Sequence, residues 1–541
     1  MQRDLRALAD ATFDLVVVGA GIYGALAAWD AARRGLRVAL VDRGDFGGAT
    51  SANSMRTLHG GLRSLQSLNL VQMRRFIRER RAMAVLAPHL VDPLPFCVPT
   101  AYHPTRNALA LRVALAITDA VGWDRHDGIA DQALRLPPGR VVSRTECLRL
   151  NPLVDAAGVT GGAVWYDYQM RHAERLLVSA VRSAAGLGAV VANYVDAQGV
   201  AMADGRVAAL QVRDALTSDV WDIRTRAVLN AAGPWAAAVA RTLTGAPVGP
   251  APRLSRAMNL VVARVTDHHA CGGGVGGRMM LAVPWRDVTI VGTSHDPHAG
   301  GADDEYGTPE HVSALLRDVQ LAFPRAGIGP GTIRVVQKGL LPMVSARGAS
   351  VALLKESAVV DHGRDGRAGL VSIFSVRYTT AGHTARQAVD AVCRQLGLDA
   401  PAPTAPFRAA SAAFDTVEAL VAEARRRAVP GTTPELRERL ALAYGSDWIE
   451  VATGAGLRHD DLAPLSAACP VTPAEVLHAV REECAVTLAD VLLRRTDAGT
   501  AGHPGPDAVR EAARVMAGVL GWSPEREAAE RRDVDGRYPA P

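Results

Sequence analysis

Residues 14–42 read DLVVVGAGIYGALAAWDAARRGLRVALVD, and this stretch decides the fold. The short, β-branched apolar run 14–18 predicts a strand, and the glycine-rich turn 19–24 leads into an Ala-rich helix. Gly35 is a candidate helix C-cap, after which residues 37–41 predict a second strand. Strand, glycine turn, helix and strand in this order predict a Rossmann-type βαβ unit that binds a dinucleotide.

Each glycine of the turn has a physical role in dinucleotide binding. Gly19 permits a tight turn, Gly21 leaves room for the pyrophosphate at the helix N-terminus, and Gly24 lets the helix pack closely on the strand. Asp42 follows about 20 residues on, where an acidic residue binds the ribose hydroxyls. Because its carboxylate would repel a 2′-phosphate, we expect a plain ribose and interpret the neighbouring Arg43 as a surface charge.

Length and composition indicate a large globular enzyme. The 541 residues suggest about three domain-sized units, and 48% hydrophobic with 21% charged residues is typical of an α/β protein. The net charge of +5 is spread over arginines interleaved with acids, so we expect no nucleic-acid partner. We interpret the charge as a solvated surface, and the alternative interpretation is a weak attraction to anionic substrates or lipid head groups.

The cysteines and the N-terminus bear on the cellular setting. Six cysteines form no C-x-x-C pair and no metal-ligand spacing, which predicts no metal site and a reduced, cytoplasmic location. Residues 1–13 lack the apolar core of a signal peptide, and no apolar run approaches the ~18 residues of a spanning helix. We therefore expect any membrane contact to be peripheral, on the inner face of the cell membrane.

Several segments beyond the βαβ unit resemble one enzyme family in sequence and order. They are GATSANS at 48–54, LHGGLR at 58–63, APHL at 87–90, AGPW at 232–235, VPW at 283–285, IVGT at 290–293, YTT at 378–380, VREECAVTLAD at 480–490 and RRT at 494–496. In these segments the chain resembles FAD-dependent glycerol-3-phosphate dehydrogenases, of the D-amino acid oxidase superfamily of flavoproteins. The resemblance covers nearly the whole chain and implies a non-covalently bound FAD.

The glycine motif and the resemblance together predict the cofactor-binding residues. Small residues at 47–54 let backbone amides approach a flavin, and the helix that opens after Thr380 would present free amides to its pyrimidine oxygens. The predicted set is Gly19, Gly21, Ile22, Tyr23, Gly24, Asp42, Arg43, Thr50, Ser51, Ser54, His59, Gly60, Gly61, Val195, Ala232, Gly233, Tyr378, Thr379 and Thr380.

The expected fold class is α/β, with three parts. A Rossmann-type FAD-binding domain is interleaved within residues 1–400 with an antiparallel-sheet substrate domain, and a C-terminal helical domain follows. The predicted boundaries are about 12–95, 155–240 and 345–398 for the FAD-binding domain, 96–154 and 241–344 for the substrate domain, 400–415 for a Pro-rich linker, 416–525 for the helical domain and 526–541 for a loosely ordered tail.

On the substrate side the chain departs from the resembling enzymes. Their Gly-x-Arg-Pro turn reads GLLP here, so Leu341 replaces an arginine, and Arg377 replaces a lysine. Asn259 stands where they have a histidine, and Lys355 where they have a phosphate-binding arginine. Arg377 could stabilise an alkoxide, and Lys338 or Lys355 could hold an anion. The candidate catalytic residues are Arg377, Lys338, Asn259, Lys355 and His59, without an assured base.

Three functions stay open at this point. The first is hydride transfer from a secondary alcohol, glycerol 3-phosphate or a related anionic polyol, to FAD and then to a quinone or oxygen. The second is oxidation of an amine or hydroxy acid whose carboxylate pairs with Arg377. The third is a flavin-bound interaction protein that has lost catalysis together with the arginine at 341. A homodimer is compatible with all three.

Overall fold

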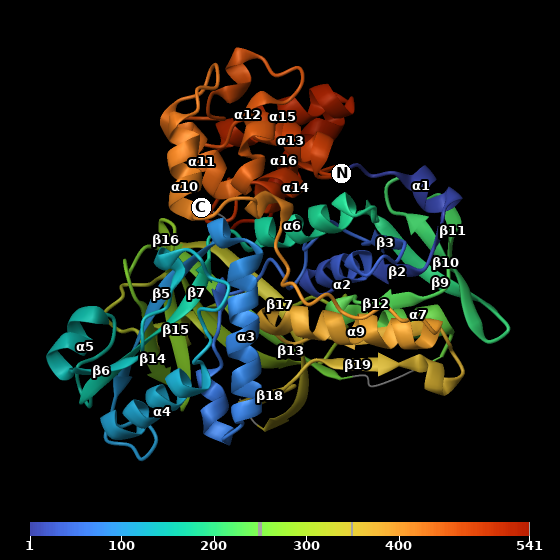
Figure 1. The fold of residues 1–541 in the computed structure, drawn as a ribbon. Helices are drawn as coiled ribbons and strands as arrows, with labels where there is room; N and C mark the ends of the chain where they lie inside the picture. Colours follow the sequence, from blue (N-terminus) through green and yellow to red (C-terminus); the bar gives the residue numbers. More distant parts are fainter. Residues whose placement is uncertain (247–251, 348–349, 540–541) are drawn as a thin grey trace.

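The computed structural model describes residues 1–246, 252–347 and 350–539 (Figure 1). The chain folds into a nucleotide-binding α/β layer, a large sheet beside it that is antiparallel except between β14 and β5, and a C-terminal group of helices that lies over both. The arrangement of a Rossmann-type domain, an antiparallel substrate sheet and a helical C-terminal region confirms the fold class predicted from the sequence.

The nucleotide-binding sheet is parallel except at one edge. Its strand order is β19-β20-β12-β2-β3-β8, and only β19 runs antiparallel to its neighbour among the described strands. The bounds are β2 Leu15–Val18, β3 Val38–Val41, β8 Val190–Ala192, β12 Val228–Asn230, β19 Ala358–Asp361 and β20 Leu370–Phe374. Strands β2 and β3 are buried on both faces, which explains their unbroken apolar sequences.

The two faces of β2 belong to different hydrophobic cores. Leu15 and Val17 point toward helices, whereas Val16 and Val18 point toward a small second sheet. That sheet has the order β1-β11-β10-β9 and packs with helices α1 and α7. The bounds are α1 Leu5–Asp10, β1 Thr12–Phe13, β9 Val195–Ala203, β10 Arg206–Asp214, β11 Val220–Thr225 and α7 Ala236–Thr244.

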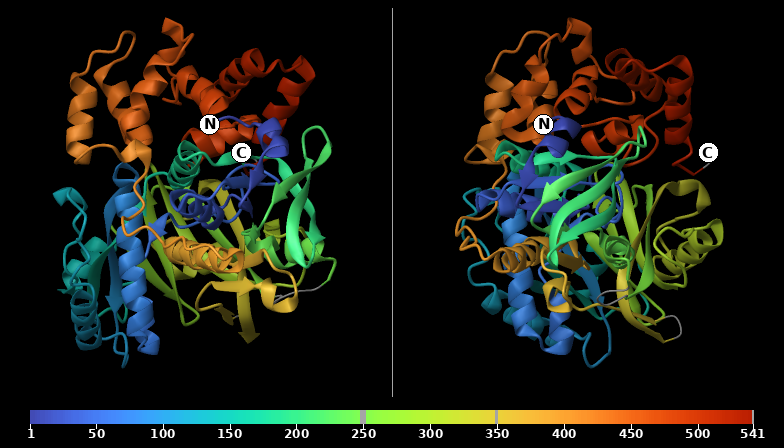
Figure 2. Two further views of the ribbon diagram at one scale, coloured as in Figure 1. Left: turned by 45° about the vertical axis from the view of Figure 1, so that its right-hand side comes forward. Right: turned by 90° about the vertical axis from the view of Figure 1, so that its right-hand side faces the viewer.

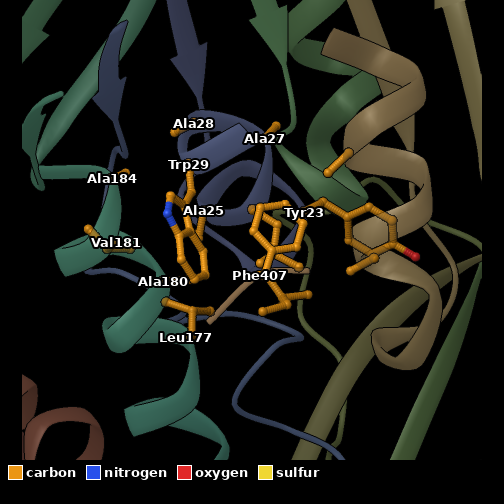
Figure 3. Close-up of a cluster of buried hydrophobic side chains, with 14 of the residues drawn as sticks. Tyr23, Ala25, Ala27, Ala28, Trp29, Leu177, Ala180, Val181, Ala184 and Phe407 are labelled. Carbon is orange, nitrogen blue, oxygen red and sulfur yellow. The ribbon is translucent and has the colours of Figure 1, made fainter. Parts of the chain in front are cut away.

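Helix α2 (Ile22–Arg33) lies between α6 (Ala173–Gly186) and α9 (Ala381–Leu396). Its alanines let these helices approach closely, and Figure 3 shows Trp29 directed at the small residues of α6. The Trp29 ring lies 4.8 Å from that of Phe407, so the segment after α9 is anchored on the same core. This packing fixes the N-terminus of α2, where the dinucleotide is expected.

The large sheet has the order β18-β17-β13-β16-β15-β14-β5-β7-β4, with β6 paired to β7. Its strands are β4 Thr57–Leu58, β5 Val91–Thr100, β6 Arg140–Ser143, β7 Gly161–Met170, β13 Arg253–Ala263, β14 Ala270–Val275, β15 Arg278–Trp285, β16 Val288–His298, β17 Ile333–Arg347 and β18 Ser350–Leu353. Its flanking helices are α3 Leu70–Leu86, α4 Ala108–Val121, α5 Arg144–Leu150 and α8 Pro309–Ala322.

The C-terminal helices form two small cores above the nucleotide-binding layer (Figure 2). They are α10 Val417–Arg426, α11 Pro434–Tyr444, α12 Trp448–Thr453, α13 Pro473–Glu482, α14 Leu488–Asp490, α15 Pro506–Leu520 and α16 Pro524–Asp535. The expectation of a loosely ordered tail from 526 is wrong up to residue 535. Helix α16 is capped by Ser523 and buries Val534, while buried Glu530 accepts a 2.9 Å hydrogen bond from the Leu488 amide.

Candidate functional site

The glycines of the turn 19–24 are required for two different reasons, the packing of the fold and the approach of a ligand. A Cβ on Gly19, whose φ is +97°, would lie 2.7 Å from the Ala231 carbonyl oxygen, and one on Gly24 would lie 1.8 Å from the Gly19 oxygen. Gly21 has φ −68° and ψ 177°, and its Cβ would meet only the Ser51 hydroxyl, at 3.2 Å. The fold itself therefore demands glycine at 19 and 24, whereas glycine at 21 suits a ligand that approaches the backbone.

Asp42 faces the same turn. Its Oδ2 accepts a 2.6 Å hydrogen bond from the Ala20 amide, and its Oδ1 accepts one of 2.9 Å from the Gly44 amide. Burial raises the pKa of this carboxyl, although the two amide bonds oppose the shift. Since each oxygen accepts only one of these amide bonds, lone pairs remain for the hydroxyls of a ribose. The carboxylate is thus positioned for the role predicted from the sequence.

The serine- and threonine-rich segment closes over the start of α2. The Ser51 hydroxyl accepts a 3.1 Å hydrogen bond from the Ile22 amide, and Thr50 donates to the Leu340 carbonyl at 3.3 Å. The Ser54 hydroxyl accepts from the Arg56 amide at 3.3 Å, so it shapes the segment itself. Residues 50 and 51 therefore lie between the nucleotide turn and the large sheet, which is where the isoalloxazine of a flavin would follow its pyrophosphate.

Residues 377–380 are tied to the same turn. The Tyr23 hydroxyl donates to the Arg377 carbonyl at 2.6 Å and accepts from the Arg377 amide at 3.1 Å. The Thr379 hydroxyl accepts a 3.2 Å hydrogen bond from the His59 amide, and Thr380 is the N-cap position of α9. Segments far apart in sequence thus meet around the N-terminus of α2. At the start of α9, however, the Ala381 amide donates to the Tyr378 carbonyl and the His383 amide donates to the Glu79 carboxylate at 2.8 Å, so these two amides are not free for a flavin as the sequence predicted.

The remaining predicted cofactor residues have mixed roles in the fold. Ala232 and Gly233 follow the end of β12, with Ala232 against Gly19. The Val195 amide donates to the Asp42 carbonyl at 2.7 Å and so supports the backbone of Asp42. The Tyr378 hydroxyl donates to the Ala173 carbonyl at 3.2 Å, and burial raises its pKa, which keeps the phenol neutral.

Arg43 is engaged on the protein surface. Its guanidinium forms a 2.7 Å ion pair with Asp303 and stacks 4.5 Å from the centre of the Trp235 ring. The Trp235 indole also donates to Asp303, at 2.7 Å. The charge of Arg43 is therefore already compensated by Asp303, and its predicted contact with the cofactor stays a prediction.

A buried carboxylate that sequence reasoning missed holds His59 and Gly60. Asp167, on β7, lies 3.4 Å from His59 Nδ1, accepts from the Gly60 amide at 2.7 Å and pairs with Arg80 at 2.5 Å. Burial alone would raise its pKa, but the His59 hydrogen bond and the Arg80 charge hold the pKa of Asp167 below its ordinary value. A lone acid in the strand sequence WYDYQM was the available signal.

The substrate-side candidates on strands β13 and β17 lie on two opposite faces of the large sheet. Asn259 pairs with Gln337, and Gly339 lies against Thr50, so this face looks toward the nucleotide turn. Asn259 accepts a hydrogen bond from Thr293 at 2.7 Å and donates to Gln337 at 3.3 Å. Gln337 is a second residue missed by sequence reasoning, although it shares strand parity with position 341.

Lys338 lies on the opposite face of β17. It pairs with buried Met258, and its ammonium donates to the Tyr306 carbonyl at 3.3 Å. Successive strand residues alternate between faces, so Lys338 cannot share a face with Asn259 and Leu341. The structure does not bring Lys338 to the site, and the expectation that it holds the substrate anion there is wrong.

Arg377 and Lys355 lie together. The Arg377 guanidinium donates to the Lys355 carbonyl and stacks 5.1 Å from the centre of the Phe76 ring. The Lys355 side chain is exposed. The backbone contacts of Arg377 with Tyr23 connect this cationic corner to the nucleotide turn. In the described part of the chain, no group of three or more His, Cys, Asp or Glu side chains could hold a metal ion.

The residues around the start of α2 fit an FAD. The turn offers an amide-lined helix N-terminus for a pyrophosphate, Asp42 offers acceptors for a ribose, and residues 50–61 and 377–380 supply small residues and hydroxyls beyond them. His59, Asn259 and Arg377 are the predicted catalytic residues whose contacts reach these segments, through Thr379, through the strand face shared with Gly339, and through Tyr23.

Comparisons with known proteins agree with this site. A family model described as FAD dependent oxidoreductase matches residues 14–351, and one described as the C-terminal domain of alpha-glycerophosphate oxidase matches residues 410–527. Glycerol-3-phosphate dehydrogenase 2 of Mycobacterium tuberculosis is 32% identical over 94% of this chain and 85% of its own length. Alpha-glycerophosphate oxidase of Lactococcus lactis is 25% identical over 96% and 95% of the two chains.

A solved structure shares the fold. The glycerol-3-phosphate dehydrogenase from Bacillus halodurans, solved in complex with FAD, superposes with a TM-score of 0.75 at 23% identity, over 98% of this chain and 95% of that one. These findings confirm the predicted resemblance and the predicted cofactor. The chain belongs to the FAD-dependent oxidoreductase family, and it is an FAD-dependent enzyme related to glycerol-3-phosphate dehydrogenases and alpha-glycerophosphate oxidases.

Proposed function

We propose that this enzyme oxidises the secondary alcohol of glycerol 3-phosphate or of a related anionic polyol. The observation that carries the proposal is the corner at Arg377 and Lys355, where the Arg377 guanidinium donates to the backbone carbonyl of Lys355 and Tyr23 holds the backbone of residue 377 beside the nucleotide turn. A C-terminal domain of the alpha-glycerophosphate oxidase type favours this substrate class over amino acids. Glycine oxidase from Geobacillus kaustophilus shares the fold at a TM-score of 0.53, but over only 74% of this chain.

In this proposal the chain's own groups bind the anion and move the hydroxyl proton. Bound FAD supplies a hydride acceptor. Arg377 and Lys355 hold the phosphate or stabilise the developing alkoxide. His59 takes the hydroxyl proton, because its side chain is 47% exposed and accessible to a substrate. Asp167 orients the ring and stabilises the imidazolium that forms.

The first prediction tests the orienting role of Asp167. We expect Asp167→Asn to lower the rate of flavin reduction about 10- to 100-fold, because the neutral amide no longer stabilises a protonated His59. The flavin content is determined on the same preparation, because Asp167 also holds the Gly60 amide, and the rate is expressed per bound flavin. Stopped-flow absorbance under anaerobic conditions measures the rate. Asp92→Asn is the control, since Asp92 lies in the same sheet and pairs with Arg171. Equal rates in the two variants would remove Asp167 and His59 from the proposed mechanism.

Leu341 provides the test of substrate class. It shares the face of Gln337 and Gly339 by strand alternation, and the resembling enzymes carry an arginine in the matching turn. We expect Leu341→Arg to lower the KM for glycerol 3-phosphate about 10-fold, because a guanidinium binds phosphate with charge-assisted hydrogen bonds. Steady-state kinetics measure it, with Leu341→Met as the uncharged control. A KM that rises only in the arginine variant would indicate a different substrate.

We propose further that the final acceptor is a quinone reached from a membrane surface. An open groove between α3, α4 and α9 is lined by Leu70, Val71, Arg74, Arg75, Arg78 and Trp123. Val71 is 74% exposed and Trp123 76% exposed, beside Arg78, whose 58% exposed side chain would attract anionic lipid, whereas Arg74 and Arg75 are paired with Asp124 and Glu356. The groove also reaches His383, three residues beyond Thr380, so it opens next to the flavin region. Oxygen is the alternative acceptor, and a cytoplasmic location and a homodimer stay predictions.

We propose a peripheral contact with the membrane. Among the described residues, no helix is both long and apolar enough to cross a bilayer. We expect the double variant Val71→Glu, Trp123→Ala to bind vesicles of phosphatidylglycerol and phosphatidylcholine at least about 10-fold more weakly than the wild type. Co-sedimentation measures the bound fraction. Leu321→Glu is the control, because Leu321 is 69% exposed on α8, outside the groove. Equal binding by all three proteins would exclude the groove.

A further inference from the structure

A fully buried carboxylate lies three residues after Asp42. The side chain of Asp45 is 1% exposed. Its Oδ1 accepts hydrogen bonds from Arg495 at 2.6 Å and from Asn193 at 2.9 Å, and its Oδ2 accepts from Arg495 at 2.8 Å and from Arg494. Burial alone would raise its pKa, but the two arginines hold the pKa of Asp45 well below its ordinary value. Asp45 is therefore an anion held by two charged donors and one neutral amide donor.

Both arginines come from the C-terminal helical region. They end a π-helical turn, Val491–Arg495, that follows α14 directly. Arg494 forms a 2.6 Å ion pair with Asp490, and Arg495 donates to the Glu483 carbonyl at 2.9 Å. Within their own domain they are thus held in fixed orientations, and each presents its guanidinium to Asp45 as a rigid group.

Asp45 in turn belongs to the loop that builds the nucleotide site. The Gly44 amide donates to the Asp42 carboxylate at 2.9 Å, and the Gly47 amide donates to the Ala20 carbonyl at 3.0 Å. The loop 42–48 therefore joins the ribose-binding carboxylate to the glycine turn, with Asp45 at its centre. The buried Phe46 ring also lies 5.5 Å from the Arg495 guanidinium.

We propose that Arg494 and Arg495 are positioning residues for FAD, and that the C-terminal helical domain completes the cofactor site by fixing the loop 42–48 through Asp45. They touch neither the substrate nor the reacting atoms. A loop ordered before binding spares the cofactor the cost of ordering it, so the arginines raise affinity without new contacts. Because coupling is reciprocal, bound FAD must also tighten the C-terminal domain on the loop.

The affinity of apoprotein for FAD tests whether Arg494 and Arg495 act as positioning residues for the cofactor. We expect Arg495→Lys, which keeps the charge but loses the bidentate fork, to raise the Kd for FAD at least about 10-fold in a fluorescence titration. Arg439→Lys is the control inside the helical domain, where Arg439 pairs with buried Glu475. Arg182→Lys is the control for domain docking, because Arg182 joins α6 to Asp447 and Glu450 of the helical domain, each at 3.3 Å. Equal Kd values in all three variants, or an equal increase, would overturn the proposal.

Hydrogen exchange tests whether bound FAD tightens the C-terminal domain on the loop 42–48. The wild-type protein is sufficient for this test, even if a variant fails to fold. Adding FAD to apoprotein should slow amide exchange in residues 484–496 as well as in 42–48. Asp45→Asn should abolish the slowing in 484–496 while the thermal midpoint of the apoprotein still reports a folded chain. A merely structural ion cluster would give the same exchange in 484–496 with and without FAD, and that result would overturn the proposal. Neither measurement involves substrate, so both are independent of the proposed reaction.

Discussion

Replacing Gly21 by valine should leave a folded protein that no longer retains FAD. Gly21 has a backbone conformation open to any residue, and a Cβ there would meet only the Ser51 hydroxyl, at 3.2 Å. The two branches of valine would instead occupy the space in front of the α2 amides, where a pyrophosphate must approach. We expect FAD binding at least about 100-fold weaker than in the wild type.

The flavin absorbance of purified protein and reconstitution with added FAD measure this effect. Gly199→Val is the matched control, because Gly199 lies in strand β9 with no atom within 4 Å of an added Cβ. It should keep full occupancy. Circular dichroism checks that both variants fold. Full flavin content in Gly21→Val would show that the dinucleotide site has been misplaced.

Replacing Arg377 by alanine should lower the rate of flavin reduction about 10²- to 10³-fold, because a preorganised charge near the reacting alcohol is lost. FAD occupancy should change little, since Tyr23 holds the backbone of residue 377 through its amide and carbonyl, which alanine keeps. Stopped-flow reduction and flavin content are measured on the same preparation.

The control for Arg377 is another arginine of the segment that follows it. Arg394 is exposed in the last turn of α9, so Arg394→Ala removes the same net charge without reaching the site. Its rate of reduction should match that of the wild type. If Arg377→Ala and Arg394→Ala reduced equally fast, the cationic corner would have no part in the reaction.

The sequence predicted best what depends on local geometry. Gly19, Gly24 and Asp42 are identifiable because a tight turn, a close helix and a ribose each demand one residue type at a fixed spacing. The apolar strands of the nucleotide-binding sheet could be predicted from the sequence equally well. The polar composition of 526–541 misled, since Val534 and Glu530 are buried by a helix that the composition does not reveal.

The substrate side depended on contacts that sequence does not contain. Asp167 reaches His59 only because β7 passes beneath the 59–61 turn, and Gln337 meets Asn259 only through strand pairing. The sheet face of Lys338 could be predicted from the sequence, because Lys338 stands three residues from Leu341 and must therefore lie on the opposite face. The sequence carries no local signal for the role of Asp45, because its partner Arg495 stands 450 residues further along the chain.

If this flavoenzyme takes a hydride from an anionic polyol, that polyol must reduce its bound FAD in the absence of oxygen. The purified holoenzyme is mixed with glycerol 3-phosphate, related polyol phosphates, hydroxy acids and amino acids, and the flavin absorbance is followed. We expect glycerol 3-phosphate or a related polyol phosphate to bleach the flavin at a rate ordinary for an enzyme, ~10 s⁻¹. Bleaching by amino acids or hydroxy acids alone, or by no member of the panel, would contradict the account.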